Sequence, residues 1–203
     1  MPYTPERTRG AVFAAAVDEF AAHGLAGARV DRIAAAAGVD KKAIYLYFGD
    51  KRALFEAVLA HDLESLAEAV PLEGDDVSGY VERLFDYHRQ HPAHLRLMLW
   101  EALELGADDV PGEAARAAHY RERAEPLGLA QRDGRIDPEL DPAGLWLALA
   151  GMVTWVFAAP QMTRMVLGHS PSAIDDQRRL LAECARRLAD GRRAGGNDMK
   201  ATT

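Results

Sequence analysis

Cysteine is almost absent from this chain, and so are long apolar runs. Cys184 is the sole cysteine among 203 residues, which excludes an internal disulfide and favours a reducing compartment. No stretch approaches about 18 uninterrupted apolar residues, so we expect no helix that spans a membrane. The opening residues, MPYTPERTRG, carry charge without the apolar segment of a secretion signal. These absences predict a soluble protein of the cytoplasm.

The sequence also lacks the motifs that many enzymes carry. It contains no glycine-rich phosphate loop, no G-x-S-x-G, no H-E-x-x-H and no paired Cys/His signature. Its carboxylates are scattered along amphipathic segments, as solvated faces are. We therefore expect no catalytic residue, no cofactor and no enzyme activity.

One group of histidines has the spacing of a metal motif. His88, His91 and His94 form the pattern HxxHxxH, but Pro92 separates the second from the third. No nearby cysteine or carboxylate completes a set of metal ligands. We interpret the three as solvated or capping side chains around a turn, and we expect no metal site.

Charge is distributed unevenly along the chain. The formal net charge is −7, yet residues 1–52 hold 8 Lys and Arg against 6 Asp and Glu, whereas the remainder holds 16 against 25. Positive charge attracts the phosphates of nucleic acids, and an acidic remainder repels them. This distribution favours site-specific DNA binding by the N-terminal region over indiscriminate coating of DNA.

The chain is organised around one N-terminal stretch, VDRIAAAAGVDKKAIYLYFGDK, which runs from Val30 to Lys51. Its first apolar residues share one face of a short helix, and Gly38 suits the left-handed position that ends such a helix. Asp40 is placed to cap a second helix, in which Ile44 and Phe48 face inward. Two short helices joined by a tight glycine turn predict a helix-turn-helix.

Two lysines at the start of the second helix point to an anionic partner. Lys41 and Lys42 lie where the helix dipole is positive, so each costs roughly 0.3–1 kcal/mol in the free protein. A helix N-terminus with free N–H groups and two lysines suits a phosphodiester backbone. Solvated surface lysines explain these two residues equally well, but Tyr45, Tyr47 and Lys51 on or beside the same helix favour DNA.

The order RVDRIAAAAGVDKKAIYLYFGDKRALF, which begins at Arg29, resembles the N-terminal signature of the TetR family of bacterial transcriptional regulators. The similarity is dense from Arg9 to Val58, about a quarter of the chain. Members of the family pair a helix-turn-helix with a larger helical domain that dimerises and often binds a small molecule. The resemblance implies that Tyr45 and Tyr47 contact DNA and that Lys51 contacts its backbone.

Two positions depart from the family's pattern. Arg29 stands where a hydroxyl residue usually opens the first motif helix, and Lys42-Ala43 replaces a common Gly-Thr. We expect these departures to affect the operator sequence and the helix cap and to leave the fold unchanged. The predicted DNA-contacting residues are Arg29, Lys41, Lys42, Ala43, Tyr45, Tyr47 and Lys51.

Helical periodicity continues along the rest of the chain, and no β pattern or internal repeat appears. Apart from the motif, we expect helices near residues 4–23, 50–70, 77–91, 92–106, 113–132, 142–157 and 171–189. Gly24 should end the first of these, Asp50 and Asp141 should cap the helices that follow them, and residues 107–112 should form a loop. The predicted fold is all-α. A DNA-binding helix-turn-helix domain of three helices covers residues 1–52, a helical effector-binding and dimerisation domain covers 53–191, and a disordered tail covers 192–203.

The second domain carries large apolar side chains, which are typical either of an ordinary core or of a ligand pocket between helices. We expect His119 and Tyr120 to supply the polar groups of such a pocket. Its predicted lining is Phe85, Met98, Trp100, His119, Tyr120, Trp146, Met152 and Trp155. The last two predicted helices are too apolar to stay half exposed, which predicts that they form a dimer interface.

Together these observations predict a cytoplasmic bacterial regulator, expected to act as a repressor. It should bind double-stranded operator DNA as a homodimer and respond to an unidentified small molecule, with no membrane partner. Two alternatives stay open. One is a DNA-binding regulator that needs no effector, and the other is a helical enzyme or carrier whose N-terminal motif is vestigial.

Overall fold

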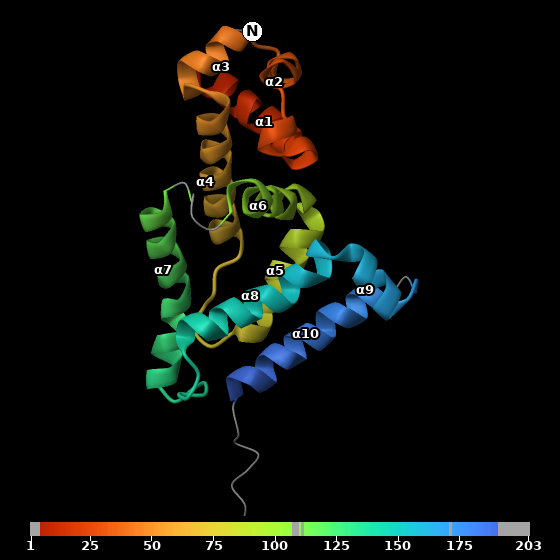
Figure 1. Cartoon of the computed structure of the whole chain (residues 1–203). Coiled ribbons are helices and arrows are strands. Elements are labelled where there is room, and N and C mark those ends of the chain that lie inside the picture. Colours follow the sequence, from red (N-terminus) through yellow and green to blue (C-terminus); the bar gives the residue numbers. More distant parts are fainter. Residues whose placement is uncertain (1–4, 107–109, 111, 171, 191–203) are drawn as a thin grey trace, which may run out of the picture. The chain divides into compact units, whose positions relative to one another are not determined.

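We describe the protein from a computed structural model that defines residues 5–106, 110, 112–170 and 172–190, with side chains from Thr8 onward in those ranges. Ten α-helices and no β-strand occur there, which confirms the all-α prediction (Figure 1). The tail predicted over 192–203 lies outside the described residues, as does part of the loop predicted after residue 106. The helices are α1 (Pro5–Gly27), α2 (Val30–Ala37), α3 (Lys41–Phe48), α4 (Lys51–Ala69), α5 (Val77–Gln90), α6 (Pro92–Leu105), α7 (Glu113–Arg132), α8 (Pro142–Ala158), α9 (Pro160–Leu167) and α10 (Ala173–Asp190).

The chain divides into two compact units. Unit 1 comprises Met1–Ala69 and Tyr87–Glu113, and unit 2 comprises Val70–Asp86 and Ala114–Thr203. Unit 1 thus contains α1 to α4 together with α6, and unit 2 contains α7 to α10. Helix α5 crosses from unit 2 into unit 1.

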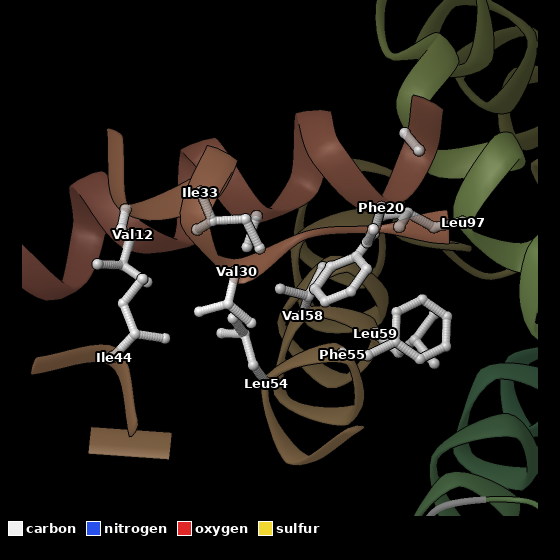
Figure 2. Close-up of a cluster of buried hydrophobic side chains, with 14 residues drawn as sticks. Val12, Phe20, Val30, Ile33, Ile44, Leu54, Phe55, Val58, Leu59 and Leu97 are labelled. Atoms are coloured by element: carbon white, nitrogen blue, oxygen red, sulfur yellow. The ribbon is translucent and has the colours of Figure 1, made fainter. Parts of the chain in front are cut away.

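Helix α1 lies at the centre of unit 1, where α2, α4 and α6 all pack against it. Its residues Val12, Ala16 and Phe20 recur every fourth position, so they share one face, and all three are buried. Phe20 meets Phe55 of α4 edge-on, with ring centroids 5.0 Å apart. Figure 2 shows this core, which also receives Val30 and Ile33 of α2, Ile44 of α3 and Leu97 of α6. Burying one side chain of this size stabilises the fold by about 1.5–3 kcal/mol.

Unit 2 is built around α8, which begins as predicted. Asp141 accepts a hydrogen bond from the Gly144 N–H at 2.7 Å, and Pro142 occupies the first helical turn. Leu145, Leu149, Val153 and Val156 of α8 are buried, whereas Leu147 and Trp155 on its other side are exposed. The helix therefore buries one face within unit 2 and leaves apolar side chains on another.

Helix α10 packs against the unit-2 part of α5 through charged groups. The Arg178 guanidinium donates to Asp86 Oδ2 at 2.8 Å and lies 3.3 Å from Glu82 Oε1. Asp86 raises the pKa of Arg178 by accepting this hydrogen bond. Because an arginine and a carboxylate pair best in a two-pronged geometry, the contact fixes the register of α10 as well as its position.

Helical geometry stops at Gly24 (φ 66°, ψ −177°), where the end of the first helix is predicted, and a short helical segment then continues to Gly27, so α1 consists of two helices joined at a kink. One element differs from the prediction. No helix is predicted over residues 160–167, yet α9 forms there, with Pro160 in its first turn and the Thr163 hydroxyl donating to Val156 O at 2.9 Å.

A helix that crosses a bilayer must be both long and apolar enough to span it. None of the described helices meets both requirements by itself. Helices α8 and α9 meet them only when taken together, by length and composition, and they are bent by 87° to each other.

Candidate nucleic-acid interface

The helix-turn-helix forms as its sequence predicts. Gly38 ends α2 in the left-handed conformation (φ 67°), and the Val39 N–H donates to Ala34 O at 3.0 Å. Asp40 then caps α3, because its Oδ1 accepts from the Lys42 N–H at 2.7 Å. At the N-cap of α2, Arg29 supplies no side-chain hydrogen bond, in keeping with its replacement of a hydroxyl residue.

Helix α3 has one buried and one exposed face. Ile44 is 1% exposed, and the ring of Phe48 meets Phe13 of α1 edge-on at 5.4 Å. On the other side Tyr45 and Tyr47 are 41% and 44% exposed, and Leu46 between them is 83% exposed. Among the described residues of α1 to α4, these three are the only large hydrophobic side chains that are exposed. Unit 1 therefore presents a short aromatic and aliphatic surface on α3.

Leu46 is a candidate contact residue that the sequence prediction missed. The signal was present, because a residue two positions from Ile44 and two from Phe48 falls on the opposite face of a helix. An apolar side chain on a helix that enters the major groove can contact the methyl group of thymine. Leu46 therefore belongs with Tyr45 and Tyr47 as a candidate reader of DNA.

The two lysines of the first α3 turn have different surroundings. Lys41 Nζ lies 2.8 Å from Asp31 Oδ1 of α2 and 5.9 Å from the centre of the Tyr45 ring. The hydrogen bond from Lys41 to Asp31 raises the pKa of Lys41. Asp31 thus offsets the positive end of the helix dipole within the protein. The Lys42 side chain is exposed and has no partner within the described residues.

Lys51 lies at the start of α4, directly after the motif. Its Nζ donates to Ala26 O and Ala28 O, both at 3.2 Å, and so satisfies carbonyl groups at the end of α1. Asp50 caps α4 by accepting from the Ala53 N–H at 2.8 Å, as predicted. An ammonium group has three hydrogens, so Lys51 keeps a donor beyond these two contacts.

The predicted effector-site residues divide between the two units. Met98 and Trp100 belong to unit 1, where the Trp100 indole N–H donates to Ala21 O of α1 at 3.2 Å. The other six belong to unit 2. Within unit 2 the structure brings Tyr120 and Trp146 together, with ring centroids 5.7 Å apart, and His119 and Tyr120, at 5.9 Å.

The remaining unit-2 members lie in other environments. Phe85 is fully buried against Phe157 at 4.8 Å, and Met152 is half-buried. Trp155 is 57% exposed on α8. Sequence reasoning missed Tyr80. Burial raises the pKa of the Tyr80 phenol, and the nearby Arg123 opposes this rise. Arg123 also donates to Val70 O. A buried phenol beside a guanidinium gives this apolar region two polar groups.

The interpretation of the three histidines as solvated or capping side chains is wrong for His88 and His94, which are buried and stacked on each other in unit 1. Their ring centroids are 5.4 Å apart, and His94 Nδ1 lies 2.6 Å from Asp62 Oδ2 of α4. Burial, helped by His94, lowers the pKa of His88 to about 3. His91 packs on Tyr87 at 4.4 Å. No set of three or more His, Cys, Asp or Glu side chains in the described part of the chain is arranged to hold a metal.

Comparison with known proteins identifies both parts of the chain. Residues 12–58 match the family described as bacterial regulatory proteins, tetR family, and residues 76–187 match the tetracyclin repressor-like C-terminal domain. The HTH-type transcriptional repressor SCO4008 of Streptomyces coelicolor is 41% identical over 186 residues, which cover 92% of this chain and 97% of that protein.

Solved structures agree with this assignment. The transcriptional regulator SCO4942 of Streptomyces coelicolor is 33% identical and superposes with a TM-score of 0.79, covering 90% of this chain and 98% of that one. AibR, solved with isovaleryl coenzyme A and operator DNA, shares the fold at 19% identity and a TM-score of 0.59, covering 78% and 97%. The chain belongs to the TetR family of DNA-binding transcriptional regulators, which act on operator DNA and are not enzymes.

Proposed function

We propose that this regulator reads its operator through the exposed face of α3. The contact residues are those expected from the sequence, Arg29, Lys41, Lys42, Ala43, Tyr45, Tyr47 and Lys51, together with Leu46. The exposure of three consecutive large side chains on α3 is the observation that carries the proposal. By sequence the DNA-binding domain covers residues 1–52, and residues 53–191 bind the effector and dimerise.

The exposed residues have chemically distinct roles in this proposal. Lys42, free of internal partners in the described structure, donates to guanine O6 and N7. Leu46 packs on a thymine methyl group, and the tyrosine hydroxyls donate to phosphate oxygens. Lys41 exchanges its contact with Asp31 for one with a phosphate. Breaking the Lys41–Asp31 pair costs little, because exposed ion pairs contribute at most about 1 kcal/mol.

The test compares Lys42→Ala and Leu46→Ala on one operator. The operator is first selected from random duplexes with the wild-type protein, and its bases are then changed singly. We expect each variant to lose about 1–3 kcal/mol on the selected operator and to lose discrimination at a different base pair. Equal affinity of both variants and wild type for every duplex would contradict base reading by α3.

We infer that the protein acts as a homodimer. Apolar side chains remain exposed along α8, α9 and α10 of the single chain, which would be costly in solution unless a second copy covered them. The larger ones are Leu147, Trp155, Met162, Met165, Val166, Leu180 and Leu188. Sedimentation of the wild-type protein at micromolar concentration should give twice the chain mass. A monomer at that concentration would contradict the inference.

We further infer that a small, mostly apolar molecule binds unit 2 and acts as the effector. The support is the cluster of Tyr120 with Trp146 and the buried Tyr80 beside Arg123. The fold is shared with AibR, whose structure holds both a small molecule and operator DNA. Such a ligand should raise the melting temperature by mass action and release the operator.

A panel of small aromatic and aliphatic carboxylates, screened by thermal shift, tests the effector site. Trp146→Ala should abolish the shift, whereas Leu129→Ala, which changes an exposed apolar residue of α7 outside the proposed site and interface, should retain it. The reverse result would place the ligand elsewhere.

Because several named relatives are repressors, we expect operator binding to lower transcription, in the cytoplasm of a bacterium.

A further inference from the structure

Helix α1 contains a break whose backbone groups are satisfied by another helix. At Gly24 the chain leaves helical geometry (φ 66°, ψ −177°), and helical turns resume beyond it, since the Ala28 N–H donates to Gly24 O at 3.1 Å. In an unbroken helix the Leu25 N–H would donate to Ala21 O. The break separates this pair, so a donor and an acceptor near the core both need new partners.

Glu104 of α6 supplies the new acceptors. The Leu25 N–H donates to Glu104 Oε2 at 2.6 Å, and the Ala26 N–H donates to both carboxylate oxygens at 3.1 and 3.2 Å. A carboxylate that accepts from N–H groups at the start of a helical turn is favoured by charge as well as by hydrogen bonding. Glu104 is therefore an N-cap supplied from a distant part of the chain.

The same face of α6 supplies the new donors. Arg96 Nε donates to Ala21 O at 2.5 Å, and the Trp100 indole N–H donates to the same oxygen at 3.2 Å. Arg96, Trp100 and Glu104 are spaced four residues apart, so they line one face of α6. One stripe of three side chains thus replaces both halves of the broken hydrogen bond.

Only a glycine fits at the break in α1. A Cβ added to Gly24 would lie 2.5 Å from Glu104 Oε1 and 2.7 Å from Trp100 Cε3, closer than real contacts allow. The positive φ of Gly24 also disfavours any other residue. The bend in α1 and the stripe on α6 are therefore shaped for each other.

The segment after the break leads directly into the helix-turn-helix. Its N–H groups are held by Glu104, and its carbonyl groups at Ala26 and Ala28 are held by Lys51 of α4. Glu19 of α1 accepts from the Arg29 N–H at 2.8 Å, at the residue that precedes α2. The junction between α1 and α2 is thus fixed from α6 on one side and from α4 on the other.

We propose that Glu104, supported by Trp100, is a positioning residue for operator recognition. It holds the second segment of α1, and through that segment α2 and α3, in the orientation that DNA reading requires. Glu104 itself contacts no DNA in this proposal. The proposal rests on α3 being the DNA-reading surface, as proposed above.

The test measures two affinities for each variant, one for the selected operator and one for a random duplex of the same length. Glu104→Gln keeps the size of the side chain but removes the charge and one acceptor oxygen. Hydrogen bonds to charged groups contribute about 1.5–3 kcal/mol, so we expect operator affinity to fall at least about tenfold. Affinity for the random duplex should stay within about twofold, because the phosphate-contacting side chains are unchanged.

The matched control is Glu56→Gln in α4, where the carboxylate forms an exposed i, i+4 pair with Arg52 and does not touch the junction. Both of its affinities should stay within about twofold of wild type. If Glu104→Gln proves unfolded by circular dichroism, Trp100→Phe provides the test. It keeps an aromatic ring but loses the N–H, and we expect about a threefold loss on the operator alone.

Folded Glu104→Gln with unchanged operator affinity would overturn the positioning role. An equal loss on the operator and the random duplex would also overturn it, because that pattern indicates general damage to the phosphate-contacting surface. Tyr45→Ala separates this proposal from the one it rests on. Full operator affinity in Tyr45→Ala would overturn the assignment of α3, whereas full affinity in Glu104→Gln alone overturns only the role of Glu104.

Discussion

The two units of this regulator treat their apolar side chains differently. In α1 to α4 of unit 1, exposed large hydrophobic side chains are confined to three consecutive residues of α3. In unit 2 such side chains recur along α8, α9 and α10. The other exposed large hydrophobic side chains of unit 1, Met98, Leu99 and Leu103, lie on α6, so the helix-turn-helix part of this unit offers one small reading surface. The pattern in unit 2 fits a unit whose surface is completed by another copy of the chain.

Polar side chains are also used differently at the α1–α2 junction of unit 1 and on the surface of α10 in unit 2. In unit 1, Glu19, Lys51 and Glu104 reach backbone groups at the junction between α1 and α2. On α10 of unit 2, Arg186 and Arg187 instead pair with acidic side chains of the same helix at its surface. Backbone contacts fix where a segment lies, whereas surface pairs contribute little.

The largest effect is expected from two neighbouring leucines of α10. Leu181 is 7% exposed, so Leu181→Glu places a charge in the core of unit 2 and should cost roughly 3 kcal/mol or more of unfolding free energy. Leu180 is 55% exposed, so Leu180→Glu should leave the chain folded but monomeric. Chemical denaturation and sedimentation measure the two effects separately.

Operator binding should follow the oligomeric state of these variants. A dimer reads two half-sites, and one half-site alone supplies only part of the affinity. Leu180→Glu should therefore bind the operator weakly despite its folded core. A dimeric Leu180→Glu variant would remove α10 from the interface and weaken the contrast between the units.

The next effect contrasts two neighbours on α3. Ile44→Ala removes a fully buried side chain and should cost about 2–5 kcal/mol of stability. Tyr45→Ala should cost little stability, because this ring lies outside the core, but about 1–3 kcal/mol of operator affinity. Ligand-induced stabilisation should be unchanged in Tyr45→Ala. If Tyr45→Ala melts early while the folded fraction binds normally, the DNA contacts assigned to α3 are wrong.

Local features were the most predictable from the sequence. The caps at Asp40, Asp50 and Asp141 were read correctly, as was the glycine that ends α2, because each depends on residues within one turn. The family assignment was confirmed because its signature is also contiguous. Helix α9 was missed, since its eight residues carry too short a pattern to distinguish from a loop.

Contacts between residues far apart in the sequence could not be predicted from local sequence patterns. Nothing in the sequence near Gly24 shows that Glu104, about 80 residues later, accepts its neighbours' N–H groups. Trp100 was predicted to line an effector site because of its residue type, and the structure shows its N–H on Ala21. Lys51 was likewise assigned to phosphate by resemblance, without its contacts to α1. The division of the effector-site residues between two units is a tertiary fact of the same kind.

A smaller effect separates the two roles of Lys51. Lys51→Ala removes two hydrogen bonds to α1 carbonyls, which should cost about 1 kcal/mol of stability. If Lys51 also contacts phosphate, the slope of log affinity against log salt should fall by about one per subunit, on operator and random DNA alike. Lys42→Ala, which loses no internal side-chain contact in the described part of the chain, should weaken DNA binding without lowering stability. A lower stability with an unchanged salt slope would leave Lys51 as a structural residue only.

The smallest effect concerns two carboxylates, Glu19 in unit 1 and Glu183 in unit 2. The hydrogen bond from Arg32 is the main reason that the pKa of Glu19 lies below its ordinary value of 4.5. Hydrogen bonds from Arg186 and Arg187 lower the pKa of Glu183 to about 2. A carboxylate whose pKa is lower in the folded state stabilises the fold above its unfolded pKa, and this contribution disappears as the pH falls through the folded value.

Replacing either carboxylate by glutamine should therefore reduce stability near pH 7, and the difference from wild type should shrink below about pH 4.5. Salt distinguishes the two sites. Glu183 lies on an exposed helix face, so about 1 M salt should remove its effect even at pH 7. The Glu19 side chain is only 10% exposed and also accepts the Arg29 N–H, so its effect should persist in salt. Equal salt sensitivity at both sites would mean that the α1–α2 junction is held no more firmly than a surface ion pair.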